Sequence, residues 1–396
     1  MKICMLTTSF PRYKGDLYLN FAYSLAKELA KKNKVYAVSS HGLDTKNYEK
    51  RDNIEIFRYY YFFPRKFQML TYRGGMIENY KRSIFAKLQL IPFFISFLLK
   101  GFSVAKKADI IHAQVILSGL VGAIIKKFIK KPLVLTVHGT DVNSIGNNIL
   151  FNLLAKFVFN NCDRIIAISN DLKKTLINKF KIDKEKIAVI PYGIDANIFR
   201  KTNKNNERKK LKLDPDSKIL LFVGRINKEK GLDYLIRAVS KARNVEKNIL
   251  LAIIGEGPEK ENLEKLTKRL NLEKHVDFAG AKKQDELPSW MNSADMLVLP
   301  SLSEGLGMVL IEAMACGTAV IGTKVGGILD IIDDNINGML VAPRNAEQLY
   351  KKIAYLLKDK EVRDKLALNG MKKAIEKFGW KKCAGDTLNV YGEITK

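Results

Sequence analysis

The residues best suited to chemistry lie at 303–317, with the sequence SEGLGMVLIEAMACG. This stretch follows an apolar run that ends at Leu299, and a helical pattern begins at Met308 directly after Gly305 and Gly307. A helix that begins after a glycine loop presents backbone N–H groups and the positive end of its dipole to a bound anion. The pattern therefore predicts a binding site for a phosphorylated ligand, and a diphosphate fits it best.

Two carboxylates in this stretch are placed for different contacts. Glu304 precedes the predicted helix, where its carboxylate can face the hydroxyl groups of a sugar. Glu312 lies eight positions further on, inside the helix, and can accept hydrogen bonds from a ribose. Either glutamate taken alone would be interpreted as a helix N-terminal charge or a solvated helix residue.

Two cations belong to a second motif, FVGRINKEKG. Arg225 follows an apolar strand pattern, and Lys230 precedes a helical one. Placed at the mouth between two domains, both cations would neutralise a leaving pyrophosphate group without a metal ion. A single arginine at a strand end is more often a surface ion-pair partner.

In the first half of the chain, the motif VHGTD places His138 at the carboxyl end of a predicted strand, beside Gly139. Open α/β sheets contact their ligands at this end of the strands, which favours a site role over the structural role that is usual for a lone histidine. Gly15, in the N-terminal loop SFPRYKGDLYLN, is a weaker candidate for contact with a phosphate or an acceptor.

Other motifs are interpreted as structural. Asp214 and Asp216 form the DxD pattern of metal-bound diphosphates, but Pro215 between them indicates a turn. The sequence GEGP at 255–258 lacks the later glycine and acid of a dinucleotide fingerprint. The four cysteines are scattered, which argues against zinc and against disulfides. We therefore expect no metal and no cofactor, and the absence of a signal-peptide core at the N-terminus predicts a cytoplasmic protein.

The composition limits the possible architectures and partners. A chain of 396 residues suits two domains of roughly 150–200 residues each. The net charge is +27, and residues 1–190 contribute most of it, with 32 Lys and Arg against 13 Asp and Glu. Such an excess suits nucleic acid, an anionic lipid surface or a phosphorylated acceptor. No base-stacking motif or recognition module accompanies the charge, so a nucleic-acid partner is not expected.

Apolar strand patterns alternate with helical patterns in both halves of the chain, which predicts an α/β protein with two doubly wound, Rossmann-like domains and a cleft between them. The polar segment 196–217 interrupts the alternation and is expected to be the linker. The predicted N-terminal domain is 1–195, and the predicted C-terminal domain is 218–376.

One strongly apolar segment, RSIFAKLQLIPFFISFLLK at 82–100, fits neither series well. It is too short and too interrupted to be a convincing membrane span. Together with the lysines up to residue 107, it suits an interfacial helix on an anionic membrane, and a buried domain helix explains the composition equally well. Both interpretations stay open on the sequence alone.

With these residues in place, the chain resembles glycosyltransferase family 4, whose members share the two-domain GT-B fold and transfer sugars with retention of anomeric configuration. The resemblance is most specific where GRINKEKG, GEGP, PSLSEGLGMVLIEAMACGTAVIGTKVGG and NGMLVAP occur in order. Leu306 departs from the phenylalanine that is common in the family. In the N-terminal loop, Gly15 stands beside Asp16 where many members have paired glycines.

The resemblance implies a role for each site residue. Arg225 and Lys230 would bind the donor diphosphate, Glu304 the transferred sugar and Glu312 the ribose. His138 would contact the donor sugar from the first domain. The remaining donor-binding positions would be Gly15, Gly224, Gly305, Leu306 and Gly307. Domain 1–195 would bind the acceptor and domain 218–376 the nucleotide sugar, and the last helix, 377–396, would cross back to the N-terminal domain.

The resulting expectation is a retaining, metal-independent transfer of a hexose from a UDP- or GDP-linked donor to a glycan or lipid-linked acceptor, in cell-surface polysaccharide or glycolipid synthesis. The enzyme would be cytoplasmic or peripheral on the inner face of the cell membrane. Two alternatives stay open: another GT-B activity, such as a nucleotide-sugar epimerase or a phosphorylase, and a non-catalytic basic binding protein.

Overall fold

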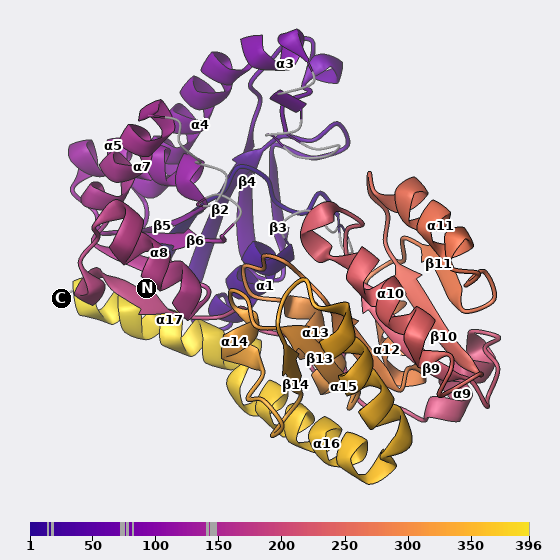
Figure 1. Cartoon of the computed structure of the whole chain (residues 1–396). Helices are drawn as coiled ribbons and strands as arrows, with labels where there is room; N and C mark the ends of the chain where they lie inside the picture. Colours follow the sequence, from indigo (N-terminus) through magenta and orange to yellow (C-terminus); the bar gives the residue numbers. More distant parts are fainter. Residues whose placement is uncertain are drawn as a thin grey trace. The chain divides into compact units, whose positions relative to one another are not determined.

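The structure, a computed structural model, describes residues 1–13, 16, 20–71, 76, 79–80, 83–139, 142 and 149–395. Gly15 therefore lies outside the described residues. The chain divides into two compact units, whose elements are labelled in Figure 1. Unit 1 comprises Met1–Ile168, Leu172–Gly193 and Trp380–Lys396. Unit 2 comprises Ser169–Asp171 and Ile194–Gly379.

Unit 1 contains an eight-stranded sheet in the order β3-β4-β2-β1-β5-β6-β7-β8. Neighbouring strands are parallel except β3 and β4, which pair antiparallel at one edge. The strands are β1 (Lys2–Leu6), β2 (Lys34–Ser40), β3 (Tyr48–Arg51), β4 (Ile54–Tyr59), β5 (Ile110–Gln114), β6 (Leu133–Val137), β7 (Arg164–Ala167) and β8 (Ile187–Val189). Every side chain of β5 and β6 is buried, as is typical of parallel strands covered on both faces.

Helices cover this sheet in two groups. α4 packs on α5 and α5 on α7, while α1 packs on the C-terminal helix α17 (Figure 1). The helices are α1 (Asn20–Leu29), α3 (Ile84–Leu88), α4 (Leu90–Ala105), α5 (Ile116–Ile129), α7 (Ile149–Asn161), α8 (Asn170–Phe180) and α17 (Trp380–Ile394). The sequence patterns do not predict the antiparallel β3–β4 hairpin, because β3 has three consecutive charged residues and Glu55 and Arg58 interrupt the apolar residues of β4.

Within the apolar segment 82–100, residues 84–88 belong to α3 and residues 90–100 to α4. The region Ile84–Ala105 is long and apolar enough to cross a membrane by length and composition, yet one face of α4 packs on β2 and β4. Phe93 and Phe97 on that face are fully buried, and the ring of Phe97 stacks on Tyr59 at 4.9 Å. The buried-helix interpretation therefore holds for one face of α4, and the other face is exposed.

Unit 2 contains a six-stranded, fully parallel sheet in the order β11-β10-β9-β12-β13-β14. The strands are β9 (Lys218–Val223), β10 (Ile249–Ile254), β11 (Val276–Gly280), β12 (Met296–Leu299), β13 (Ala319–Thr323) and β14 (Met339–Val341). The helices are α9 (Lys204–Lys210), α10 (Leu232–Ala242), α11 (Lys260–Arg269), α12 (Leu287–Ser293), α13 (Met308–Ala315), α14 (Ile328–Ile331), α15 (Ala346–Lys358) and α16 (Lys360–Lys377). The predicted fold class, two Rossmann-like α/β domains, is confirmed.

The segment 196–217, expected to be a linker, is instead part of unit 2 and contains helix α9. Its order comes from charge pairing. The buried Arg208 donates to Asp295 at 3.0 Å, and Lys204 contacts the same carboxylate at 2.6 Å. Burial raises the pKa of Asp295, but Lys204, the N–H of Ile219 and Arg208 together lower it by more, so the net shift is downward. Apolar periodicity cannot reveal such a segment because ion pairs hold it in place.

The C-terminal helix α17 is tied to the sheet of unit 1 by a buried polar chain. The Tyr391 hydroxyl lies 2.6 Å from His112 Nδ1, and His112 Nε2 lies 2.7 Å from the Thr136 hydroxyl. Burial lowers the pKa of His112 to about 3, so its imidazole is neutral at physiological pH. Tyr391 is fully buried, and its ring also contributes to the apolar core under α1. The last helix is thus an integral part of unit 1.

We predict that Tyr391→Phe lowers the free energy of unfolding of unit 1 by about 1–3 kcal/mol, because it leaves a buried imidazole nitrogen without its partner. Urea titration followed by circular dichroism measures the loss. Tyr355→Phe is the matched control, because Tyr355 is exposed on α15 and its substitution is expected to be neutral. Equal stability of the two variants would contradict the proposed tether.

Candidate functional site

The strand order of unit 2 defines where a ligand can bind. The chain proceeds from β9 toward β11 on one side and from β12 toward β14 on the other, so β9 and β12 flank the switch point of the sheet. In open α/β sheets, ligands bind outside the carboxyl ends of the strands at this point. Here these ends carry the loops 224–231 and 300–307, which contain most of the residues that the sequence analysis selected.

An ion pair joins these two loops. Lys230 Nζ lies 2.6 Å from Glu304 Oε2, and the hydroxyl of Ser301 donates to the same oxygen at 3.1 Å. The side chains of Lys230 and Glu304 are 21% and 14% exposed, so both are shielded but still open to a ligand. Ser301 itself is buried. One carboxylate oxygen thus holds a cation and a hydroxyl at the carboxyl edge of the sheet.

The backbones of the two loops also touch. The N–H of Leu302 donates to the Glu229 carbonyl at 2.7 Å. Gly231 adopts a left-handed conformation with φ of 60°, and a Cβ atom there would lie 2.3 Å from the Pro300 carbonyl oxygen. Any side chain at position 231 would therefore push the loops apart and separate Lys230 from Glu304.

A third loop, after β13, packs against the loop 300–307. The N–H of Gly327 donates to the Glu304 carbonyl at 3.2 Å. A Cβ atom at Gly326, where φ is 51°, would lie 1.9 Å from that same oxygen, and one at Gly327 would lie 2.4 Å from the Gly305 carbonyl. The glycine pair 326–327 thus permits the close approach that positions Glu304.

Helix α13 begins at Met308, as the sequence predicts, directly after Gly307. Gly307 has φ of 92°, and the N–H of Leu310 donates the first helical bond to its carbonyl at 2.9 Å. The N–H groups of Met308 and Val309 precede that bond and lie at the positive end of the helix dipole. This arrangement suits a bound phosphate group at the carboxyl edge of β12.

Glu312 lies in the second turn of α13 and is half-buried. Burial raises the pKa of its carboxyl to about 7. The carboxyl therefore titrates near neutral pH, and its ionised form would gain from hydroxyl donors such as those of a ribose. A solvated helix glutamate would not show such a shift, so Glu312 differs from an ordinary surface residue of a helix.

Arg225 follows β9 in the same loop as Lys230, and its side chain is exposed. Gly224 precedes it. The N–H of Gly224 donates to the Ile254 carbonyl at 2.9 Å, which extends the hydrogen bonding between β9 and β10 by one residue. The structure thus places Gly224, Arg225, Lys230, Glu304 and the start of α13 at one edge of unit 2. The sequence analysis expected Arg225 and Lys230 to face the ligand together. In the structure, Lys230 forms an ion pair with Glu304.

His138 lies in unit 1, at the carboxyl end of β6, where the sequence analysis placed it. Its ring lies 4.6 Å from the ring of Phe21 and 5.5 Å from that of Tyr192, with which it stacks. Burial lowers the pKa of His138 to about 3, and the nearby His112 lowers it further. At neutral pH it is therefore an uncharged imidazole in an aromatic setting.

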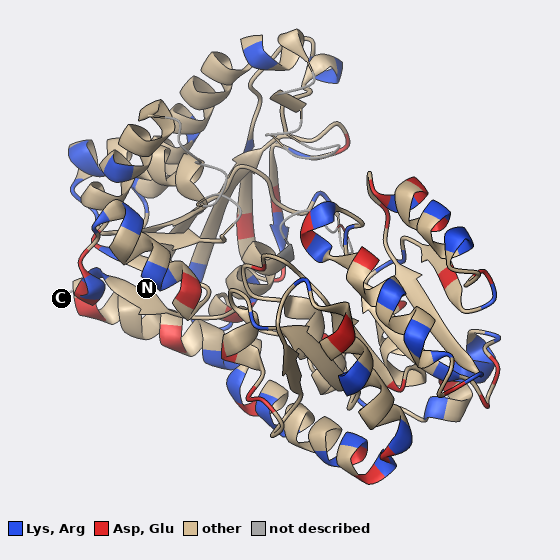
Figure 2. Ribbon diagram, viewed as in Figure 1, with Lys and Arg blue, Asp and Glu red and all other residues tan. Residues whose placement is uncertain are grey.

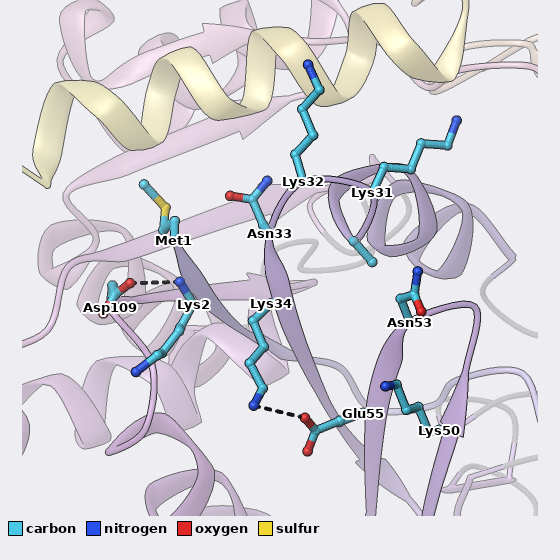
Figure 3. A pocket seen from close by; sticks show the side chains of 11 residues that line it. Met1, Lys2, Lys31, Lys32, Asn33, Lys34, Lys50, Asn53, Glu55 and Asp109 are labelled. Carbon is cyan, nitrogen blue, oxygen red and sulfur yellow. Dashed lines mark hydrogen bonds and ion pairs between the residues drawn. The ribbon is translucent and has the colours of Figure 1, made fainter.

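A pocket of about 670 Å³ also occurs at the opposite, amino edge of the unit 1 sheet (Figure 3). Lysines line it, but Lys34 is paired with Glu55 at 3.3 Å, and Asp109 accepts the backbone N–H of Lys2 at 2.7 Å. Parallel sheets bind their ligands at the carboxyl edge, so this pocket is not the candidate site.

Sequence reasoning missed three residues that shape the site: Ser301, Gly326 and Gly327. A serine two positions after a strand carries no distinctive signal. The adjacent glycines in TKVGG did provide one, since paired glycines after a strand often mark a close backbone approach. What they approach is fixed only by the fold.

Comparisons with known proteins identify the family. Residues 20–198 match the model described as Glycosyltransferase Family 4, and residues 203–373 match the model Glycosyl transferases group 1. An uncharacterised glycosyltransferase of Methanocaldococcus jannaschii is 30% identical over 405 residues, covering 99% of this chain and 98% of the relative. The chain belongs to the group 1, family 4 glycosyltransferases. The resemblance inferred from the sequence motifs is thereby confirmed, and the protein is a glycosyltransferase enzyme.

Further relatives of this glycosyltransferase agree with the assignment. A D-inositol 3-phosphate glycosyltransferase of Catenulispora acidiphila is 32% identical over 303 residues, which span 72% of this chain and 70% of the relative. Among solved structures, sucrose-phosphate synthase from Thermosynechococcus elongatus has a TM-score of 0.81 at 23% identity, covering 99% of this chain and 98% of that one. The HepE protein of Anabaena in complex with UDP-glucose has a TM-score of 0.76 at 20% identity, and each chain is fully covered. These likenesses establish the GT-B fold.

We predict that Gly326→Ala destabilises the glycosyltransferase by about 1–3 kcal/mol, since the new methyl group overlaps the Glu304 carbonyl. Thermal unfolding measures the loss of stability, and the same variant is expected to lose nucleotide binding. Gly385→Ala is the control, because a Cβ atom at that position of α17 meets nothing within 4 Å. Unchanged stability in Gly326→Ala would show that the two loops are not held in this close contact.

Glu312 generates a prediction about pH. A carboxyl whose pKa rises from 4.5 to about 7 on folding reduces stability as the pH increases through that interval. Glu312→Gln removes this loss and is therefore expected to be more stable than the wild type at pH 8, by up to about 3 kcal/mol, and nearly equal to it at pH 4. Melting temperatures at the two pH values test the difference.

Glu347→Gln is the control for this experiment. Glu347 is bonded to Lys241, an interaction that lowers its pKa, so its substitution is not expected to stabilise the protein at high pH. If Glu312→Gln and Glu347→Gln change the melting temperature by the same amount at pH 8 and at pH 4, the carboxyl of Glu312 is not desolvated.

Proposed function

We propose that this glycosyltransferase transfers a hexose from a UDP- or GDP-linked donor to an acceptor hydroxyl, with retention of anomeric configuration and without a metal ion. The observation that carries the proposal is the Lys230–Glu304 pair at the switch point of unit 2, next to the start of α13. A diphosphate needs cations and N–H donors, and a sugar needs a carboxylate acceptor. This edge of the sheet offers all three.

The pair is suited to an exchange of partners. In the free enzyme Lys230 neutralises Glu304, and both side chains are held in place at low exposure. When the donor binds, Lys230 turns to a phosphate oxygen, while Glu304 accepts hydrogen bonds from hydroxyl groups of the sugar. Each charge keeps a partner in both states, so neither is left buried and unpaired.

We assign the remaining proposed contacts with the donor from the place of each residue in its unit. The N–H groups at the start of α13 face the second phosphate, Arg225 adds a cation from the loop that contains Lys230, and Glu312 in its ionised form accepts the ribose hydroxyls. His138 of unit 1 supplies a neutral imidazole for a hydroxyl of the sugar. The ligands UDP and UDP-glucose in the HepE complexes belong to that protein and support a nucleotide sugar here.

In the proposed reaction, the acceptor oxygen attacks the anomeric carbon on the face from which the nucleoside diphosphate departs. The bond between the anomeric carbon and the phosphate oxygen breaks, and the departing phosphate oxygen takes the acceptor proton. The protein supplies no nucleophile. Its cations and helix N–H groups stabilise the charge that develops on the leaving group. We propose a glycan or lipid-linked acceptor at the cytoplasmic side of the cell membrane, in polysaccharide or glycolipid synthesis.

We predict that Lys230→Ala and Glu304→Ala each lower kcat/KM for transfer at least about 100-fold, with a similar loss in Arg225→Ala. The double variant Lys230→Ala/Glu304→Ala is expected to lose less than the product of the two single losses, because each single variant leaves one charge of the pair without its partner. The assay follows radiolabelled UDP-glucose and GDP-mannose with soluble and lipid-linked saccharide acceptors.

Lys241→Ala is the control, because Lys241 pairs with Glu347 at an exposed site on α10 and is expected to leave transfer unchanged. Release of nucleoside diphosphate that depends on the acceptor supports transfer. A changed sugar on an intact nucleotide would identify an epimerase instead and contradict the proposal.

A further inference from the structure

Helices α3 and α4 expose an unusually long apolar stripe. Its members recur every three or four positions, so they lie along one side of the two consecutive helices. The stripe consists of Ile84, Leu88, Ile91, Ile95 and Leu99. Each side chain is more than half exposed, and Ile84 reaches 77%. This surface is distinct from the buried face of α4, which Phe93 and Phe97 occupy.

Neighbouring elements extend the stripe. Phe67 contacts Phe85 of α3, and Phe128 of α5 contacts Phe102 of α4. α7, which packs against α5, exposes Ile149, Leu150 and Leu153 at 61–76%. Exposed apolar side chains that occur singly need no explanation, whereas a continuous set over neighbouring helices indicates an interaction surface.

The charges around this surface are predominantly positive. Between residues 83 and 161 the sequence contains nine lysines and two aspartates. Helices α3, α4, α5 and α7 carry no acidic residue, as the scarcity of red on them in Figure 2 shows. Lys87, Lys127 and Lys156 lie exposed on three of these helices, and Lys106 and Lys107 directly follow α4. A partner for this face must therefore combine apolar and anionic groups.

Two further contacts show that α3 and α4 lie along the surface of unit 1 rather than leaving it. The break between them is at Gln89, whose side-chain amide donates to the Phe67 carbonyl at 2.6 Å and whose oxygen accepts the N–H of Met69 at 3.0 Å. A buried polar side chain fixed in this way ties the helices to the loop 60–71. The helices can then present their stripe to a flat apolar layer while the opposite face stays in the core.

We propose that the exposed face of α3, α4, α5 and α7 docks on an anionic lipid bilayer. In this arrangement the stripe enters the boundary between headgroups and acyl chains, and the surrounding lysines extend to lipid phosphates. The bilayer supplies both groups that the face requires, and its surface extends over neighbouring helices that pack on one another. This docking depends only on unit 1 and does not rest on the proposed sugar transfer.

Flotation of the full chain with lipid vesicles tests the proposal. The wild type is expected to float with vesicles of phosphatidylcholine and phosphatidylglycerol in equal parts, and at least tenfold less with phosphatidylcholine alone or at 0.5 M NaCl, where charge is screened. Ile91→Asp/Leu99→Asp is expected to lose at least tenfold in bound fraction. Both side chains are exposed at 71% and 67%, so the fold should tolerate the change.

Leu368→Asp/Ile375→Asp is the matched control, because it places two aspartates on exposed apolar positions of α16 in unit 2. Its flotation should equal that of the wild type, and all three proteins should share a melting temperature. Equal binding to both vesicle types, or equal flotation of the two variants, overturns the proposal. A third outcome also overturns the proposal: the wild type is a dimer that does not float, and only Ile91→Asp/Leu99→Asp is a monomer. In that case the face joins two copies of the chain.

Discussion

The backbone of the loop after β12 lies directly on the backbone of the loop after β13, and the candidate site depends on this contact. Gly326 and Gly327 approach the carbonyls of Glu304 and Gly305 more closely than any side chain would permit. That approach fixes Glu304, which in turn holds Lys230 and accepts from Ser301. The ion pair of Lys230 and Glu304 therefore depends on close contact between the main chains of the two loops.

The same principle operates around the first loop, after β9. A Cβ atom at Gly255 would lie 1.9 Å from the Gly224 carbonyl, and one at Gly257 would lie 2.1 Å from that of Ile226. Many residues of the motifs that mark this family therefore make contacts among the loops at the carboxyl edge of one sheet. Their glycines permit the close contacts that bring Lys230, Glu304 and the start of α13 to the same edge of the sheet.

Much of this could be predicted from the sequence. Alternating apolar strands and helices gave both Rossmann-like units, and the start of α13 at Met308 follows from the glycines before it. The pairing of Lys230 with Glu304 could not be predicted, because residues 74 positions apart meet only through the strand order. Segment 196–217 was misjudged because ion pairs to Asp295, rather than apolar burial, hold it in unit 2. The segment 82–100 stayed ambiguous because α4 is apolar on its buried face and on its exposed face alike.

The central claim is that the diphosphate of the donor binds at the switch point of unit 2. Hydrogen–deuterium exchange of the full chain, with and without saturating UDP or GDP, tests it most directly. The account predicts that one of the two nucleotides slows exchange in the loop 224–231 and at residues 300–310, where N–H groups would contact phosphates. Protection confined to the lysine-lined pocket at the amino edge of unit 1, with no change in those two segments, would contradict it.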